Sequence, residues 1–335
     1  MRKGADSSTV KTAFVTGATG FLGVNLAALL RAEGWRVVAI HRPASRVTEL
    51  RDLGVELVPG AIDDPASLER GMPEGMDVVF HVAGNTSVWS RNDAAQTRDN
   101  VEGTRNVAAA ALARGARLMV HTSSVTVYGL GEFRANEETP PAEECPVNYF
   151  RTKRLAEREV EAAAARGLAT AVLRPGNIVG PGDRHNWARL IQLVAAGKLP
   201  GSPPGRASWC HVREVVRAHL SAAERGGAGG AWGLSCVEAS YAEFISAVAA
   251  ATGGRAPRVL PELLLRGYAG LLSLGAAVTG REPEVTPESV AISCNRVTLE
   301  SARATRELGY RPSTLQEMVT DCVSWMRAEG LLGKP

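Results

Sequence analysis

Residues 12–23 read TAFVTGATGFLG. The first five are a short apolar run, which predicts a buried strand, and apolar residues recur at helical spacing over residues 21–33. Glycines between a strand and a helix allow a tight turn and let the backbone approach a pyrophosphate at the positive end of the helix. A plain strand-to-helix turn is the alternative. We predict a dinucleotide-binding turn whose cofactor contacts are Gly17, Thr19, Gly20, Phe21, Leu22 and Gly23.

The alternation of strand and helix continues through the first half of the chain. Further β-rich runs occupy residues 36–40, 55–59, 77–82, 117–122 and 169–173. Helical patterns separate most of them, and the longest cover residues 93–114 and 147–165. Strands that alternate with helices predict βαβ units and a parallel sheet. The predicted fold class is therefore α/β, with a doubly wound parallel sheet of the Rossmann type.

The pattern changes near residue 181, where proline and glycine cluster and helices begin to dominate. We expect a smaller, mostly helical lobe at the carboxyl edge of the sheet, where open α/β sheets bind ligands. The glycine-rich residues 226–230 are expected to form a loop. The predicted division is a dinucleotide-binding domain over residues 1–180, to which residues 206–238 return, and a substrate lobe over residues 181–205 and 239–335.

The composition is that of a globular protein, with 45% hydrophobic and 22% charged residues among 335. A net charge of only +3, dispersed along the chain, argues against a nucleic-acid partner. The five cysteines form no C-x-x-C pair, which argues against a disulfide framework or a cysteine zinc site and fits a reducing cytoplasm. The histidines lack the spacing of metal ligands, so no metal site is predicted.

The longest uncharged run covers residues 267–280. It is too short to cross a bilayer as a helix, so no membrane span is predicted. We expect a buried core or interface helix there, with a helix on a membrane surface as the alternative.

The end of the second predicted strand bears on the choice of cofactor. A site specific for NAD usually has an acidic residue about 20 residues beyond the glycine turn, where it holds the ribose diol. Here the strand ends in His41-Arg42-Pro43, with no carboxylate nearby. An arginine can pair with a 2′-phosphate, so Arg42 favours NADP(H), while NAD(H) stays possible. The alternative is a solvated arginine on a loop.

Tyr149 and Lys153 occupy positions i and i+4 of a predicted helix, which places both on one face. A phenol needs help to exchange a proton near neutral pH, and a neighbouring cation lowers its pKa. With five tyrosines and five lysines in the chain, a chance pair at this spacing is rare. Ser124 follows the strand at residues 117–122, where its hydroxyl can point at a substrate oxygen.

Six motifs together resemble the extended short-chain dehydrogenase/reductases, that is, the NAD-dependent epimerase/dehydratase family. They are TGATGFLG at 16–23, HVAG at 81–84, NVEGTRNV at 100–107, TSSVTVYG at 122–129, YFRTK at 149–153 and RPGNIVGPGD at 174–183. The resemblance implies that Tyr149 is the general acid/base, that Lys153 binds the nicotinamide ribose, and that Ser124 bonds the reacting oxygen. It also implies further cofactor contacts from Ile62, Asp63, Val82, Ala83, Asn100, Thr122, Pro175, Asn177 and Ile178.

Departures from the family pattern indicate which branch of the family this sequence resembles most. Val125-Thr126 stands where the dehydratases have an Asp-Glu pair, so dehydration is not expected. Ala207 replaces the arginine that holds a sugar diphosphate in the epimerases, although Asn177 matches their asparagine. The pattern is most similar to the dihydroflavonol 4-reductase and 3-beta-hydroxysteroid dehydrogenase branch. Its expected pocket residues are Asn85, Trp89, Phe150, Trp187 and Trp209.

The expected activity is an NADP(H)-dependent interconversion of a ketone or aldehyde and an alcohol on a small, fairly apolar molecule. A nucleotide-sugar epimerase and a non-catalytic NADP-sensing protein are the alternatives. The resemblance also implies a homodimer, in which residues 93–114 and 147–165 of two subunits form a four-helix interface.

Overall fold

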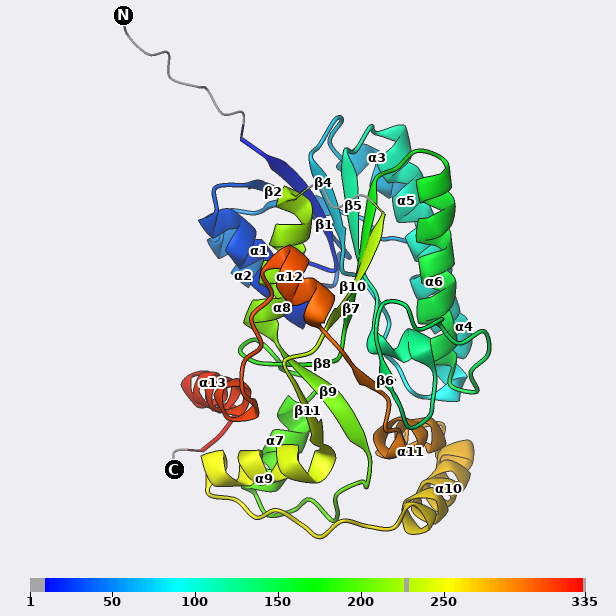
Figure 1. Cartoon of the computed structure of the whole chain (residues 1–335), viewed down its shortest axis with the longest axis vertical. Helices are drawn as coiled ribbons and strands as arrows, with labels where there is room; N and C mark the ends of the chain where they lie inside the picture. The colour runs from blue at the N-terminus through cyan, green and yellow to red at the C-terminus, as the bar shows by residue number, and fades with distance from the viewer. Residues whose placement is uncertain (1–9, 226–228, 334–335) are drawn as a thin grey trace, which may run out of the picture.

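The computed structural model describes residues 10–225 and 229–333. Within these residues, the central sheet has seven parallel strands in the order β10-β7-β5-β4-β1-β2-β3 (Figure 1). The crossover between β3 and β4 marks the point where the strand order reverses, as in a doubly wound sheet. The strands are β1 (Thr12–Thr16), β2 (Arg36–His41), β3 (Glu56–Pro59), β4 (Val78–His81), β5 (Leu118–Thr122), β7 (Thr170–Pro175) and β10 (Gly230–Leu234).

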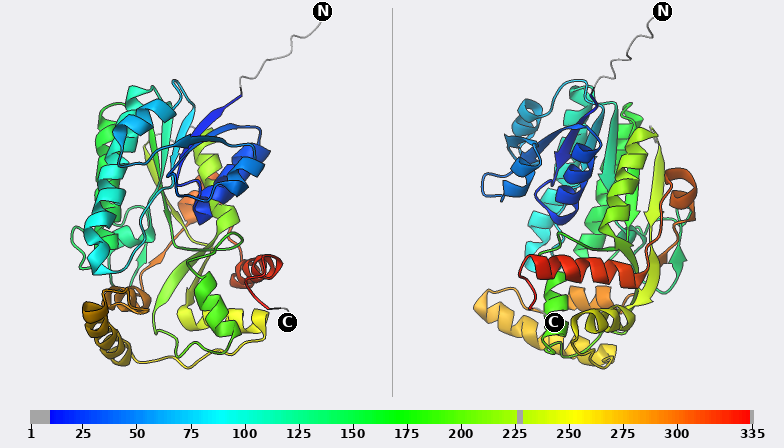
Figure 2. Two further views of the ribbon diagram at one scale, coloured as in Figure 1. Left: turned by 180° about the vertical axis from the view of Figure 1, so that it is seen from behind. Right: turned by 90° about the vertical axis from the view of Figure 1, so that its left-hand side faces the viewer.

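Each face of this sheet packs against its own layer of helices (Figure 2). Because successive side chains of a strand point to opposite faces, Ala13 and Val15 of β1 enter one hydrophobic core and Phe14 enters the other. The first face is covered by α1 (Phe21–Ala32), α2 (Thr48–Asp52), α8 (Val212–Glu224) and α12 (Ala302–Leu308). The second is covered by α3 (Pro65–Gly71), α5 (Gly103–Ala113) and α6 (Asn148–Ala165).

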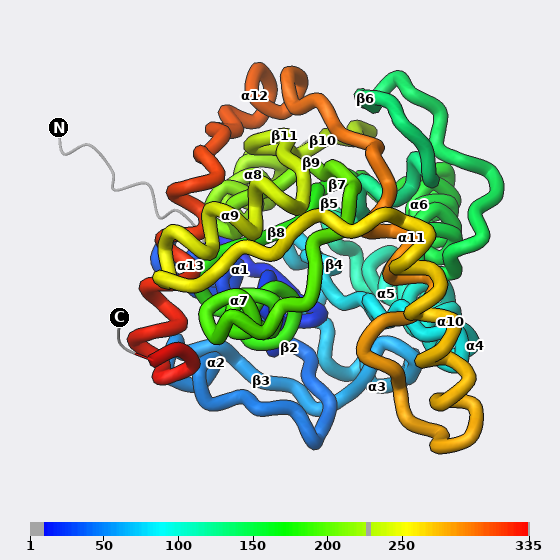
Figure 3. The backbone as a smooth tube through the Cα atoms, turned by 90° about the horizontal axis from the view of Figure 1, so that it is seen from below, coloured from blue at the N-terminus to red at the C-terminus, as the bar shows by residue number. Residues whose placement is uncertain are grey.

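A second body of structure lies beyond the carboxyl ends of the strands (Figures 1 and 3). Its three-stranded sheet has the order β11-β9-β8, and the bounds are β8 (Asn177–Val179), β9 (Arg206–His211) and β11 (Val237–Ser240). An aromatic and aliphatic core joins this sheet to α7 (Ala188–Ala195), α9 (Tyr241–Thr252) and α13 (Leu315–Ala328). The remaining elements are α4 (Asp93–Thr97), α10 (Glu262–Thr279), α11 (Pro287–Cys294) and the short paired strands β6 (Arg134–Ala135) and β12 (Thr298–Leu299).

The predicted α/β class with a mostly helical carboxyl-terminal lobe is confirmed, and the differences are local. The helix expected over residues 93–114 is α4 and α5 joined by a π-helical turn, Arg98–Glu102. Within residues 206–238, β10 belongs to the large sheet and α8 packs against that sheet. Strand β9 and the start of β11 belong to the small sheet instead. The loop predicted at 226–230 lies partly outside the described residues, and its last residue begins β10.

The uncharged run at 267–280 forms most of α10, but α10 is not the buried core helix that we expected. Only Ala269 and Ala276 of this helix are buried. Its large apolar side chains point to the surface because its contacts are with the neighbouring α11 and with one loop. Among the described residues, no helix combines the length and the apolarity that crossing a bilayer requires.

Candidate functional site

The glycine turn after β1 has a geometry that requires glycine. Gly17 has φ = +71°, and a Cβ there would lie 2.6 Å from the main-chain nitrogen of Ala83 at the end of β4. A Cβ at Gly23 would lie 2.1 Å from the oxygen of Gly17, so the turn and α1 are in close backbone contact. Helix α1 has no side-chain cap and no acidic residue in its first turn, so its free N–H groups and positive end suit a pyrophosphate. The turn therefore fits the phosphates of a dinucleotide.

The residues predicted beyond this turn lie at the carboxyl ends of the strands. Arg42 directly follows β2 and is exposed. Among the residues that the structure describes, no carboxylate lies within ion-pair distance of its guanidinium group. Asp63 is also at this edge, but Arg98 lies 3.7 Å from its carboxylate. The main-chain oxygen of Ile62 accepts a hydrogen bond of 3.0 Å from Asn106, which fixes this segment on α5.

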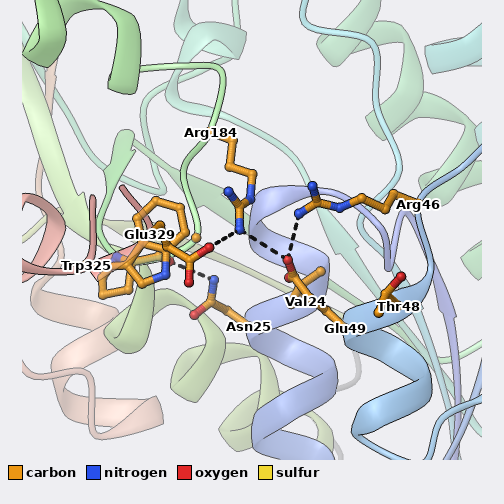
Figure 4. A pocket seen from close by; sticks show the side chains of 10 residues that line it. Val24, Asn25, Arg46, Thr48, Glu49, Arg184, Trp325 and Glu329 are labelled. Atoms are coloured by element: carbon orange, nitrogen blue, oxygen red, sulfur yellow. Dashed lines mark hydrogen bonds and ion pairs between the residues drawn. The ribbon is translucent and has the colours of Figure 1, made fainter. Parts of the chain in front are cut away.

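A cavity of about 610 Å³ beside α1 was not predicted from the sequence (Figure 4). Arg46 and Arg184 reach toward it from two sides, and both contact Glu49, at 2.9 and 3.4 Å. Arg184 also pairs with Glu329 at 2.5 Å. Both guanidinium groups therefore already have a carboxylate partner, with which a phosphate would have to compete. The lining of this cavity does not include the predicted catalytic residues.

Ser124, Tyr149 and Lys153 come from two elements that meet at the carboxyl edge of the sheet. Ser124 follows β5 and caps a 3-10 turn, Val125–Tyr128, by accepting a hydrogen bond of 3.2 Å from the nitrogen of Thr126. Its hydroxyl also lies within reach of the Tyr149 phenol. Tyr149 and Lys153 stand one turn apart at the start of α6. The Lys153 ammonium donates a bond of 2.7 Å to the main-chain oxygen of Thr122, the last residue of β5.

The electrostatics of this group differ from our expectation. Burial raises the pKa of the Tyr149 phenol, and a hydrogen bond with Ser124 acts in the opposite direction. We expected the nearby ammonium to lower that pKa, but the loss of water outweighs any such effect in this structure. Burial also lowers the pKa of Lys153, to about 8, while the charge of Glu157 opposes that shift. The phenol is therefore protonated at neutral pH, which is the form that can donate a proton.

Asn100 occupies the π-helical turn and organises the loop that follows β4. Its side-chain oxygen accepts a bond of 2.7 Å from the nitrogen of Asn85, and its amide donates to the oxygen of Asn85 at 2.9 Å. The same amide donates to the hydroxyl of Thr152 at 3.0 Å, so the loop is attached to α6 beside Lys153. The side chain of Asn85 bonds to Asp99 at 2.9 Å. Asn85 therefore uses its amide within the protein.

The other predicted cofactor residues surround this edge. Val82 and Ala83 follow β4 and are partly buried, and Pro175 ends β7. Asn177 and Ile178 belong to β8, where the Asn177 side chain opposes the rise that burial causes in the pKa of Tyr241. Thr122 offers its carbonyl to Lys153, whereas its hydroxyl lies 2.8 Å from His219 of α8 on the other face of the sheet.

Two of the five predicted pocket residues are buried in the structure. Trp209 is fully buried, stacks on Phe244 at 4.1 Å, and donates its indole N–H to the oxygen of Ala239 at 3.0 Å. Phe150 is only 2% exposed. Their place in a pocket stays a prediction, because a single sequence does not distinguish an aromatic side chain in a core from one in a pocket wall.

Trp187 and Trp89 keep exposed surface. Trp187 is partly buried with its ring 4.9 Å from that of Trp209, so it forms the outer layer of the aromatic core. Trp89 lies in the loop after β4, with the guanidinium of Arg91 5.4 Å from its ring centre. Of the five predicted pocket residues, Trp89 and Trp187 thus have side chains that a small molecule could touch without displacing the core.

Buried histidines flank the site, and their part in it was not predicted. His81 and His121 are register partners on β4 and β5, with their rings 5.2 Å apart. Burial, together with the charge of Lys153, lowers the pKa of His81 to about 3. The pKa of His121 is lowered by the same two causes in the same order. Both are therefore neutral at pH 7 and place no positive charge next to Lys153.

Comparisons with known proteins agree with this arrangement. A profile described as "NAD dependent epimerase/dehydratase family" matches residues 13–234. The "Putative dihydroflavonol 4-reductase" of Synechocystis sp. is 31% identical over 327 residues, which are 95% of this chain and 95% of that protein. The "Sterol demethylase protein B" of Methylococcus capsulatus is 31% identical over 328 residues, covering 96% of this chain and 100% of that protein.

Among solved structures, this chain is similar to UDP-glucose-4-epimerase from Stenotrophomonas maltophila, crystallised with bound NAD and formylated UDP-arabinopyranose. The TM-score is 0.76 and the sequence identity is 25%. The match covers 96% of this chain and 99% of that one.

Proposed function

The chain belongs to the NAD dependent epimerase/dehydratase family, and we propose that this extended short-chain dehydrogenase/reductase is an NADP(H)-dependent reductase or dehydrogenase. It would interconvert a ketone or aldehyde and the corresponding alcohol on a small, fairly apolar molecule. The observation that carries the proposal is the meeting of Ser124, Tyr149 and Lys153 at one edge of the sheet, beside the glycine turn.

In this proposal Tyr149 is the general acid in the direction of reduction. Its raised pKa keeps the proton on the phenol until charge develops on the substrate oxygen. Ser124 would hold that oxygen beside Tyr149, because its hydroxyl accepts from Thr126 and can turn its proton from the phenol to the substrate. Lys153 would bind the nicotinamide ribose and stabilise the phenolate that remains after proton transfer. When bound, the nicotinamide supplies or accepts the hydride.

The names of relatives favour apolar substrates. Those reported above are named for dihydroflavonol reduction and for sterol demethylation, and both names refer to molecules with a framework of several carbon rings. Further relatives are named as a 2-alkyl-3-oxoalkanoate reductase and as a ketoreductase of a farnesyl-substituted quinoline oxide. Three of these four names state a reductase, and a fairly apolar ketone is the substrate class that we propose from them.

NADP(H) is proposed as the preferred cofactor because of Arg42. The guanidinium is exposed directly after β2, where a ribose-binding carboxylate is absent from the sequence. Arg46 is a poorer candidate for the 2′-phosphate, since Glu49 lies 2.9 Å from it.

A nucleotide-sugar epimerase is the second candidate, and the similarity to UDP-glucose-4-epimerase is the observation that favours it. Against it, Ala207 stands where the diphosphate arginine is expected and is 8% exposed in the core of the small sheet. The neighbouring Arg206 is exposed, and its guanidinium donates to the oxygen of Glu238 at 3.4 Å.

The test is NADPH oxidation by the purified protein with a panel of polycyclic and alkyl ketones and a parallel panel of UDP-sugars. The proposal expects NADPH to be consumed in equal amount to the alcohol formed. Interconversion of two UDP-sugars without net redox change would establish the epimerase instead. Tight NADPH binding without turnover of either panel would favour a sensor.

We also propose a homodimer, on the strength of the family resemblance. Ala108, Ala110 and Ala111 of α5 are buried against the chain's own sheet, so the contact would use the outer face of α5 and α6. Arg105 and Glu159 pair across that face at 2.8 Å. A mass in light scattering near that of one 35.4 kDa chain would contradict the dimer.

A further inference from the structure

Helix α10 presents a continuous apolar face to solvent. Six of its large apolar side chains are between 45% and 89% exposed, namely Leu263, Leu264, Tyr268, Leu271, Leu274 and Val278. With 3.6 residues per turn, these positions fall within an arc of about 140°. Gly267 and Gly275 share the arc, and it contains no charged residue. Contiguous exposed apolar surface of this kind is typical of an interaction site.

The opposite side of α10 is its contact with the rest of the protein. The buried Ala269 and Ala276 lie there, and α11 is the helix that packs against it. Because α10 is attached through the side that carries these two alanines, its apolar arc faces solvent. Figures 1 and 3 show α10 at the edge of the molecule.

The charges around this helix are mostly basic. Arg91, Arg258 and Arg281 are exposed near its two ends, and among the residues that the structure describes none of them pairs with a carboxylate. The acids nearby are largely neutralised: Glu262 contacts Arg266 at 2.6 Å, and Glu284 contacts Arg189 at 2.5 Å. Glu282 is the exposed exception.

We infer that α10 docks on the surface of an anionic phospholipid bilayer, with Leu271 and Leu274 at the centre of the inserted face. An amphipathic helix lying in the interface buries its apolar face among the acyl chains, and flanking basic residues gain from anionic headgroups. A second copy of the chain is a poorer occupant. A two-fold interface built on this face would bring the same unpaired arginines of both copies together, and like charges repel.

The position of α10 connects this surface to the candidate site. Arg91 donates to the oxygen of Ala277 at 3.4 Å, and Thr286, just before α11, donates to the oxygen of Val88 at 2.7 Å. Both bonds attach the α10–α11 pair to the loop that carries Asn85 and Trp89. A docked α10 would bring that loop close to the lipid. If the proposed function holds, an apolar ketone dissolved in the bilayer could then enter without crossing water.

The experiment is flotation of the full chain with vesicles made of equal parts phosphatidylcholine and phosphatidylglycerol. The wild type should float with the vesicles. Leu271→Ser with Leu274→Ser should weaken its vesicle affinity by about tenfold or more, because two large apolar side chains no longer insert. Val10→Ser is the control: Val10 is 64% exposed and precedes β1, at the amino ends of the strands and away from α10, so its variant should float like the wild type.

Two further arms keep the inference falsifiable. Arg258→Glu with Arg281→Glu should also weaken flotation, and an unchanged affinity would overturn the anionic bilayer as the partner. A wild type that stays with the soluble fraction would overturn docking. A wild-type dimer that becomes a monomer in the leucine variant would also overturn it, because the apolar face would then bind a second copy of the chain. NADPH oxidation with a water-soluble ketone should be the same in the leucine variant and the wild type, which shows that the variant is folded. That assay also separates failure of docking from failure of the proposed function.

Discussion

The ammonium group of Lys153 donates a hydrogen bond of 2.7 Å to the main-chain oxygen of Thr122. This bond joins the start of α6 to the end of β5, and its two residues lie 31 positions apart in sequence. Lys153 is only 7% exposed, so the carbonyl replaces water that the charged group has lost. The lysine is thus held in place at the edge of the sheet before any ligand binds.

Replacement of Lys153 by alanine should damage both cofactor affinity and rate. The variant loses the donor proposed for the nicotinamide ribose and the charge that stabilises a phenolate. We expect NADPH affinity to fall by about tenfold or more, as for a lost hydrogen bond to a charged group, together with a lower kcat. Fluorescence titration of NADPH gives the first quantity and steady-state kinetics the second. An unchanged Kd would remove Lys153 from the ribose site.

Replacement of Tyr149 by phenylalanine should remove catalysis and leave folding intact. It deletes one hydroxyl at the start of α6, so NADPH affinity and Tm should change little. General acid catalysis is worth roughly 10²- to 10⁴-fold, and kcat should fall by about that factor. Tyr268→Phe is a matched control, because that phenol is 45% exposed on α10. If the Tyr149 variant retained more than about a tenth of the turnover, with chemistry rate-limiting, the acid would be another group.

The buried histidines should make the protein sensitive to mild acid. The pKa of His81 is lowered to about 3 by burial and by Lys153, and that of His219 to about 4 by burial, against an ordinary 6.5. Both are neutral when folded, so the unfolded chain binds more protons between pH 6.5 and 4, and stability falls as the pH falls. Each contributes a loss of roughly 2 kcal/mol between pH 6.5 and 5.

Urea denaturation at pH 7 and at pH 5 measures this loss. His219→Gln should have a smaller difference between the two pH values than the wild type, even if it is less stable at pH 7. An equal difference would mean that folding does not shift the pKa of His219.

The parts of the fold that local pattern determines could be predicted from the sequence. The β1 turn and α1 follow from a short apolar run, three glycines and a helical repeat within a span of 21 residues. The strands of the large sheet are continuous apolar runs because both of their faces are covered. In contrast, β8 is only three residues long and lies between prolines and glycines, so it gives no clear pattern.

What could not be predicted depends on partners far apart in sequence. Asn100 lies in a π-helical turn between two α-helices, and nothing in the residues of this turn distinguishes it from an ordinary α-helical turn. The hydrogen bond between Thr122 and His219 joins residues 97 positions apart, so no pattern of neighbouring residues predicts it. Trp209 is buried because both faces of β9 are covered, and Phe244 of α9 stacks on its ring. This burial depends on how the whole lobe packs and not on the residues next to Trp209.

A buried ion pair beneath the candidate site gives a stability prediction. Arg174 at the end of β7 donates twice to Glu157 of α6, both at 2.8 Å, and Glu157 is 1% exposed. Glu157→Gln should lower the free energy of unfolding by about 3–5 kcal/mol, because it leaves a buried guanidinium without its counter-ion. Arg174→Met with Glu157→Leu should cost less, since no unpaired charge remains. Thermal denaturation of both variants tests this, and equal losses would show that the charge is compensated elsewhere.

The last prediction concerns Arg42 and the choice between the two dinucleotides. If its guanidinium pairs with the 2′-phosphate, Arg42→Ala should lose a charge-assisted contact of roughly 1.5–3 kcal/mol, which is about tenfold to a hundredfold in NADPH affinity. NADH affinity should hardly change, because NADH has a hydroxyl in that position. Arg46→Ala is the matched control: Arg46 is exposed on the same segment but already pairs with Glu49 at 2.9 Å, so it should affect NADPH much less. Titration of the wild type and both variants with each dinucleotide gives the six constants needed. Equal affinity of the wild type for NADPH and NADH would refute the preference, and the 2′-phosphate would then have no proposed partner on this edge of the sheet.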